Sequence, residues 1–258
     1  MPIGVFDSGI GGLSVLTVLK RELPHEDFIY IGDNANNPVG NRTPEEIEAL
    51  ALAIGRKLAA MPVKMLVIAC NTFTVIAGEI LSRELKIPVV GMMQGVSDSL
   101  SVTEGTIGIM ATAATIESHK HKIAIAGKLK DAKKHIRIIE QPCPDLAACI
   151  EGGHLEDQAL KDMARGYLKP LMGAQVDTII LGCTHYPLIQ KVLESMYPVN
   201  YVDPAYETAA AVMEELTYGE RNRQGKTRIY FTKDAKQVQP IVERIFPGEP
   251  ITVELITL

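Results

Sequence analysis

The chain has 258 residues, of which 47% are hydrophobic and 22% are charged, which suits one large α/β domain or two small ones. Its net charge of -5 argues against nucleic-acid or anionic membrane partners. No apolar run approaches the roughly 18 residues of a spanning helix, and the start "MPIGVFDSG" lacks the basic opening of a signal peptide, so we expect a cytoplasmic protein.

Short apolar runs rich in Val and Ile, bounded by Gly, Pro or Asp, predict strands along the whole chain. They are residues 3–7, 27–33, 64–70, 87–92, 106–111, 136–141, 178–183, 199–203 and 228–232. Amphipathic stretches lie between them, such as 43–60 and 155–173. In the first of these, Thr43 as N-cap, Pro44 and Glu46 predict a capped helix start. This alternation predicts an α/β fold of parallel sheets covered by helices on both faces.

Part of this pattern is repeated. The stretch "VKMLVIACNT" aligns with the later "VDTIILGCTH", so that Cys70 matches Cys183. Earlier in each half, "IGVFDS" from Ile3 resembles "IGIMAT" from Ile107. We therefore expect two pseudo-symmetric parallel-sheet α/β units that face each other across a cleft. Because ligands of open α/β sheets bind beyond the carboxyl ends of the strands, both cysteines should reach this cleft.

The four cysteines are too few in a chain of this length for a disulfide framework. They form no CxxC pair and no Cys/His cluster at zinc-ligand spacing, so no metal site is expected. Cys143 and Cys149 are interpreted as small core residues. Five histidines are interpreted as structural or surface residues: His25, His119, His121, His135 and His154. The most basic segment, residues 128–137, is interpreted as a solvated helix face.

Two opposed thiols can invert a stereocentre without a cofactor. A thiolate on one side removes a proton from carbon, and a thiol on the other side returns one. At the same strand ends, Asp7 is expected to assist Cys70, and His185 to assist Cys183. A further set of donors would hold the carboxylate of a carbanion intermediate: Asn71, Thr72 and Thr184.

The motifs "IGVFDSGIGGLSVL", "ACNT", "GCTHYPL" and "FTKD", in this order, resemble glutamate racemase, within the cofactor-independent aspartate/glutamate racemase superfamily. The resemblance covers nearly the full length, and the "CTH" form is similar to the glutamate branch. It implies Cys70 and Cys183 as the acid/base pair, with Asp7 and His185 as assistants and Glu151 as an acidic residue near His185. The residues that the resemblance places around the substrate are Asp7, Ser8, Pro38, Val39, Gly40, Asn71, Thr72, Thr115 and Thr184.

The resemblance also implies no cofactor, an amino acid as the small-molecule partner, a homodimer, and D-glutamate supplied to peptidoglycan. The first α/β unit would comprise residues 1–93 and 208–258, and the second residues 94–207.

Several loop residues differ from the usual pattern of this family. They are Asn36, Val39, Phe73, Gln94, Gly95, Ala111 and His121. We expect them near the distal end of the substrate, where Val39 replaces a tyrosine. Donors left for a distal carboxylate would be backbone N–H groups near Gly40, the Thr115 hydroxyl, and the amides of Asn36 or Asn37.

Three other functions are consistent with parts of the sequence. One is a racemase of the same mechanism acting on another amino acid or small acid. Another is a non-catalytic ligand-binding protein, although binding alone needs no pair of thiols. The third is a thiol hydrolase that uses one cysteine and His185, which leaves the other cysteine without a role.

Overall fold

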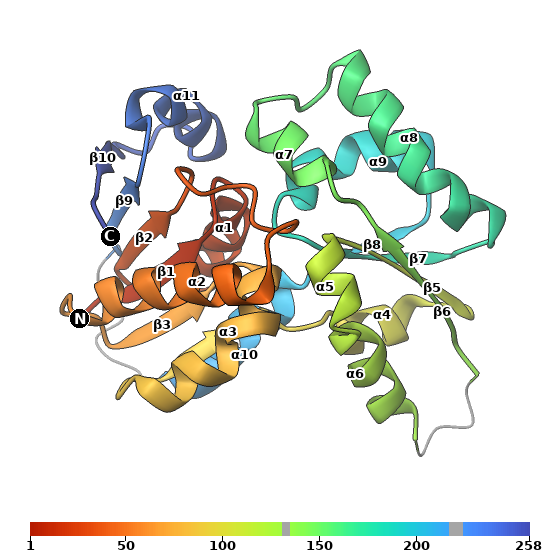
Figure 1. The fold of residues 1–258 in the computed structure, drawn as a ribbon, viewed down its shortest axis with the longest axis horizontal. Coiled ribbons are helices and arrows are strands. Elements are labelled where there is room, and N and C mark those ends of the chain that lie inside the picture. The colour runs from red at the N-terminus through yellow and green to blue at the C-terminus, as the bar shows by residue number, and fades with distance from the viewer. Residues whose placement is uncertain (131–134, 217–223) are drawn as a thin grey trace.

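A computed structural model describes residues 1–130, 135–216 and 224–258 of the chain. The strands of these residues form two parallel sheets, which lie side by side with helices around each (Figure 1). The larger sheet has the order β10-β9-β2-β1-β3-β4 and comprises β1 (Ile3–Asp7), β2 (Phe28–Gly32), β3 (Met65–Ile68), β4 (Val89–Gly91), β9 (Thr227–Phe231) and β10 (Val253–Leu255). The smaller sheet has the order β6-β5-β7-β8 and comprises β5 (Thr106–Ala111), β6 (Arg137–Pro142), β7 (Thr178–Gly182) and β8 (Asn200–Val202).

Each sheet has one hydrophobic core on either face, as expected for parallel strands that are apolar throughout. The larger sheet packs against α1 (Gly12–Glu22), α10 (Ala205–Glu215) and α11 (Ala235–Ile245) on one face and α2 (Pro44–Ala59) and α3 (Asn71–Glu84) on the other. The smaller sheet packs against α7 (Leu146–Glu151), α8 (Gln158–Gly173), the 3-10 helix η1 (Tyr186–Ile189) and α9 (Gln190–Met196) on one face and α4 (Val96–Val102), α5 (Ala113–Glu117) and α6 (Lys120–Leu129) on the other. None of the described helices is long and apolar enough to cross a membrane.

The sequence repeat corresponds to a repeated strand order. Strands β2-β1-β3-β4 of the larger sheet have the same order as β6-β5-β7-β8 of the smaller one. In each sheet the strand that begins with the "IG" motif pairs directly with the strand that precedes a cysteine, β1 with β3 and β5 with β7. The predicted fold class, two parallel α/β units, is therefore confirmed.

The nine predicted strands correspond to β1 to β9, and the N-cap at Thr43 is confirmed. Strand β10 was not predicted, because it is a three-residue edge strand in which two residues are exposed. The interpretation of residues 128–137 as one helix face is wrong at its end, where Arg137 begins β6. Residues 131–134 of that segment, and residues 217–223, lie outside the described residues.

We expect Thr43→Ala to lower the free energy of unfolding by about 0.5–2 kcal/mol. The Thr43 hydroxyl accepts from the Glu46 backbone N–H at 3.3 Å, and the Glu46 carboxylate accepts from the Thr43 N–H at 3.0 Å. Urea denaturation measures the loss, with Thr43→Ser as the control that keeps the hydroxyl. Equal midpoints for the alanine and serine variants would contradict this role.

Candidate active site

The two matched cysteines open onto one small cavity between the sheets. Cys70 follows β3 and is the N-cap of α3, and Cys183 follows β7 just before η1. Both are buried. The cavity has a volume of about 20 Å³. It is lined by Ser8, Asn37, Pro38, Val39, Gly40, Cys70, Asn71, Thr72, Thr112, Pro144, Ala147, Cys183, Thr184 and His185.

Cys70 lies at a helix N-terminus but is enclosed by apolar surroundings. Burial raises the pKa of the Cys70 thiol well above its ordinary value, and the negative charge of Asp7 raises it further. The backbone N–H of Phe73 and the Ser8 hydroxyl, 3.8 Å from the sulfur, act in the opposite direction. Cys70 therefore carries its proton in this closed arrangement.

Asp7 ends β1, beside the strand that precedes Cys70. Its Oδ2 atom accepts from the backbone N–H groups of Gly12 at 2.7 Å and Gly9 at 3.3 Å. Burial raises the pKa of Asp7 to about 6, although His185 and the Gly12 N–H oppose this shift. Since this pKa is close to neutral, the Asp7 carboxyl can take a proton from Cys70 or return one.

Cys183 has a different partner. His185 Nδ1 lies 3.8 Å from the Cys183 sulfur, and its Nε2 lies 2.6 Å from Glu151 Oε2. Burial alone lowers the pKa of His185, but the interactions with Cys183 and Glu151 outweigh it and raise that pKa well above the ordinary value. The imidazole is thus held as a cation next to the Cys183 sulfur, where it can give a proton to that sulfur or take one from it.

Glu151 also bonds the other unit. Its Oε1 and Oε2 atoms accept from the backbone N–H of Ile10, at 3.2 and 3.0 Å, in the glycine-rich turn after β1. One carboxylate at the end of α7 therefore contacts His185 of its own unit and the turn that follows Asp7 in the facing unit.

Three threonine hydroxyls form a cluster on one side of the cavity. Thr72 Oγ1 lies 3.0 Å from that of Thr112 and 3.3 Å from that of Thr115, and these last two are 3.0 Å apart. Thr72 and Thr112 line the cavity, whereas Thr115 lies behind them.

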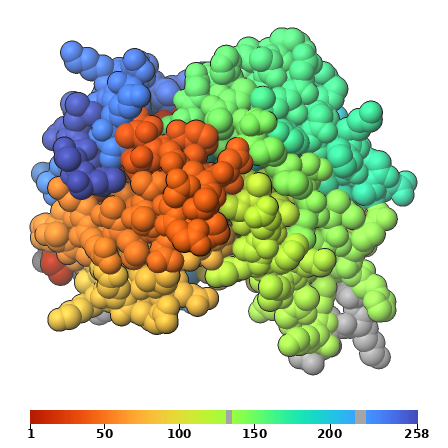
Figure 2. Space-filling model, in the orientation of Figure 1, coloured from red at the N-terminus to blue at the C-terminus, as the bar shows by residue number. Residues whose placement is uncertain are grey.

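A loop of the first unit covers the cavity. The carbonyl of Gly40 accepts from the Ala114 N–H at 3.3 Å, and the side chain of Asn41 donates to the Pro144 carbonyl at 3.3 Å. Figure 2 shows the orange segment of the first unit in contact with the yellow-green segment of the second on this face. The covered cavity, with a volume of about 20 Å³, is far smaller than the roughly 300–1,000 Å³ of a typical small-molecule pocket.

The structure brings most of the predicted residues together. Those that line the cavity are Ser8, Pro38, Val39, Gly40, Cys70, Asn71, Thr72, Cys183, Thr184 and His185. Asp7 and Glu151 contact the lining residues from behind. Cys143 and Cys149 pack in the core of the smaller sheet, as predicted.

Three further residues line the cavity: Thr112, Pro144 and Ala147. Thr112 follows the second "IG" strand as Ser8 follows the first, and this strand end directs it to the cleft. Pro144 and Ala147 carry no polar side chain that would have distinguished them.

Of the unusual loop residues that we expect near the distal end of the substrate, Val39 lines the cavity. Phe73 is fully buried in the core beside Phe6. His121 is buried next to Gly182, as a structural residue. The remaining members, Asn36, Gln94, Gly95 and Ala111, also do not line the cavity. Gly95 begins α4 with a φ of 64°, a conformation that favours glycine.

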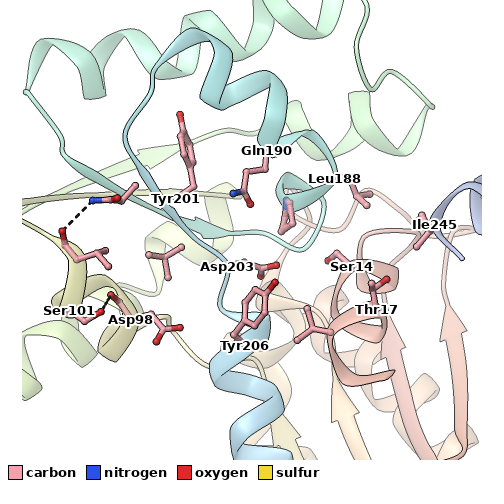
Figure 3. Close-up of a pocket in the computed structure, with 15 residues that line it drawn as sticks. Ser14, Thr17, Asp98, Ser101, Leu188, Gln190, Tyr201, Asp203, Tyr206 and Ile245 are labelled. Atoms are coloured by element: carbon pink, nitrogen blue, oxygen red, sulfur yellow. Dashed lines mark hydrogen bonds between the residues drawn. The ribbon is translucent and has the colours of Figure 1, made fainter. Parts of the chain in front are cut away.

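A larger hollow of about 660 Å³ lies between the two units, where α1, α4, η1 and α10 approach one another (Figure 3). Its lining includes no cysteine or histidine, so it is not the place of thiol chemistry. Ser14 connects it to the thiol cavity, because its hydroxyl donates to the carbonyl of Thr184 at 2.8 Å. Among the described residues, no group of three or more His, Cys, Asp and Glu side chains could hold a metal ion.

Two facing α/β units that each contribute a buried thiol, with a carboxyl group beside one and an imidazole beside the other, define a class of proton-transfer enzyme. The Asp/Glu/Hydantoin racemase model matches residues 3–212. The chain belongs to this racemase family.

Individual relatives agree with this assignment. The chain is 40% identical over 219 residues to the glutamate racemase of Ectopseudomonas mendocina, covering 83% of this chain and 80% of the relative. Glutamate racemase isoform RacE1 from Bacillus anthracis has a similar structure, with a TM-score of 0.89 and 33% sequence identity. The match covers 100% of this chain and 97% of the RacE1 chain. The structure of the Francisella tularensis glutamate racemase in complex with D-glutamate matches with a TM-score of 0.85 and 31% sequence identity. This match covers 99% of this chain and 97% of the Francisella chain.

We expect Glu151→Gln to lower the pKa of His185, because it removes the negative charge 2.6 Å from Nε2 while keeping an oxygen acceptor for the Ile10 N–H. An NMR titration of the histidine rings measures this change, and His185→Asn assigns the signal. Glu140→Gln is the matched control, since Glu140 contacts His119 on the surface. An unchanged His185 titration in Glu151→Gln would contradict this view of the site.

Proposed function

We propose that this protein interconverts L- and D-glutamate by a two-base mechanism in which Cys70 and Cys183 remove and return the proton at Cα. The single observation that carries the proposal is the shared cavity: two cysteines from matched positions of two facing sheets, each with its own acid–base partner. The complex of the Francisella tularensis relative with D-glutamate supports glutamate as the substrate.

The reaction conserves atoms and needs no cofactor. One cysteine, as thiolate, takes the Cα proton, and the bond electrons pass into the α-carboxylate. The thiol on the opposite face then gives its proton to Cα, so that the configuration is inverted. The enzyme returns to its starting state after proton exchange between each sulfur and its partner, Asp7 for Cys70 and His185 for Cys183.

Stabilising the carbanion requires donors that are already in place. The side chains of Ser8, Asn71, Thr72 and Thr184 are suitable, since all four line the cavity between the sulfurs. The Asn71 amide nitrogen is buried without a hydrogen-bond partner, so it is available to the α-carboxylate. The covered cavity must widen for entry, because its volume is far below that of a pocket that holds a small molecule.

In the cell, the proposed role is cytoplasmic supply of D-glutamate to peptidoglycan. The proposed units are residues 1–93 with 208–258, and residues 94–207. The homodimer stays a prediction, which size-exclusion chromatography with light scattering tests.

We expect Cys70→Ser and Cys183→Ser each to lower racemisation by about 10²–10⁴-fold, the usual contribution of a proton-transfer group. Incubation with a panel of L-amino acids in D₂O identifies the substrate and tests the mechanism, because deuterium enters at Cα of each amino acid that the enzyme racemises. Cys143→Ser is the matched control for a buried thiol outside the cavity. Near-wild-type turnover in either test variant would exclude the two-base mechanism, and deuterium entering only another amino acid would exclude glutamate.

We also expect Asp7→Asn and His185→Asn to affect the two reaction directions differently. Each assistant contacts one sulfur, so its loss should lower kcat most in the direction where that sulfur takes the Cα proton. The equilibrium constant between enantiomers is one, and so kcat/KM must fall equally in both directions. Circular dichroism from each enantiomer measures kcat, and the same directional bias in both variants would contradict the assignment of partners.

A further inference from the structure

Asn37 lines the thiol cavity with a hydrogen-bonding group that has no partner in the protein. Its Nδ2 atom is buried and unpaired, like Nδ2 of Asn71 in the same cavity. Leaving a buried donor unpaired costs folding free energy. Such a donor on the wall of a binding cavity therefore indicates a group that the substrate supplies.

The surroundings of Asn37 place it at one end of the covering loop. A Cβ atom added to Gly9 would lie 2.5 Å from Asn37 Nδ2 and also within 2.5 Å of both carboxylate oxygens of Glu151, so these two side chains are neighbours. A Cβ atom added to Gly40 would lie 2.7 Å from Thr112 Cβ. The segment 37–40 thus runs from the turn after β1 to the start of α5 in the facing unit. It forms a wall of the cavity, with Asn37 at the end where the Asp7 turn lies.

The neighbouring amide of Asn36 cannot serve the same purpose. Its Nδ2 atom already donates to both carboxylate oxygens of Asp33, at 3.1 and 2.9 Å. The backbone carbonyl of Asn36 accepts from the guanidinium of Arg42. Asn36 is therefore part of the support of the loop, and it does not line the cavity.

The cavity lining also limits how a second carboxylate can be held. It includes no lysine or arginine, and its cation, His185, is engaged by Cys183 and Glu151. A buried carboxylate must still be hydrogen-bonded. Val39 offers only methyl groups, and Thr115 lies behind the lining. Asn71 is next to Cys70 and is used for the α-carboxylate in the proposed reaction. Beside the hydroxyl groups and the backbone N–H groups near Gly40, Asn37 is then the lining residue whose side-chain amide nitrogen is still unpaired.

We propose that Asn37 is a specificity-determining residue, whose amide N–H donates to the side-chain carboxylate of the substrate. This inference rests on the proposed racemase function and names the residue that selects the substrate. The amide can also rotate to present its oxygen, which would accept from the side-chain amide of glutamine.

The test compares three variants of the full-length protein with the wild type. Asn37→Leu keeps the approximate volume but removes the donor. Asn37→Asp replaces the donor by a negative charge. Ala35→Asp is the matched control, because it adds the same charge to the same loop at an exposed position outside the cavity.

In Asn37→Leu we expect KM for glutamate to rise about 10- to 100-fold, the range for one charge-assisted hydrogen bond, with a smaller change in kcat. In Asn37→Asp we expect the ratio of kcat/KM for glutamate over glutamine to fall by at least about tenfold, since the new charge repels a carboxylate and accepts from an amide. Ala35→Asp should keep this ratio and KM close to the wild-type values.

Thermal unfolding separates this role from a structural one. Removing an unpaired buried donor should leave the melting temperature of free Asn37→Leu unchanged or higher, while the stabilisation by added D-glutamate decreases. A clear loss of stability in the free variant, with KM unchanged, would assign Asn37 to the fold and overturn the inference.

The outcomes distinguish this inference from the proposed function. If the wild type racemises glutamate and Asn37→Leu has the same KM, only the role of Asn37 is wrong. If glutamate is inert in D₂O, glutamate racemisation is wrong, and the same variants are assayed on the amino acid that the panel identifies. An unchanged KM on that substrate, or no exchange with any amino acid, overturns the role of Asn37 as well.

Discussion

The carboxylate of Glu151 joins the two halves of the molecule at the place where the thiols meet. It accepts from His185 in its own unit and from the Ile10 backbone in the other. The same charge keeps His185 protonated beside Cys183, so a single carboxylate fixes both the relative position of the units and the electrostatics of one thiol. Glu151 therefore acts on geometry and on charge together.

The two thiols are matched in position but not in electrostatics. Cys70 has a buried carboxyl group beside it and a pKa raised by burial, whereas Cys183 has an imidazolium beside it. Cys70 therefore starts as a proton donor, which serves the direction in which Cys183 takes the Cα proton. The opposite direction starts only after proton exchange between each sulfur and its partner, Asp7 or His185. The duplicated fold supplies the position of the thiols, and the different neighbours supply their complementary charge states.

The enclosure of the cavity restricts the entry of a substrate. The groups that surround the cavity are nearly all buried, and desolvation strengthens their interactions. The cavity is also too small for an amino acid, and hydrogen bonds at Gly40, Asn41 and Ile10 hold the units together. Widening the cavity for a substrate must break or rearrange these bonds, together with those of Ser14 with Thr184 and of Thr72 with Thr112.

The sequence by itself determined the parallel α/β fold, the repeat and the cap at Thr43, because these depend on local periodicity and on residues close in the chain. It also placed Cys70 and Cys183 at strand ends, where parallel topology directs ligands. Only the tertiary structure distinguished Asn37 from Asn36, two neighbours of the same type whose amides differ in what the folded loop places beside them. The contact of Glu151 with His185, 34 residues apart, likewise depends on how α7 packs against the end of β7. Such contacts follow from the path of the chain in three dimensions, which no local pattern of residues specifies.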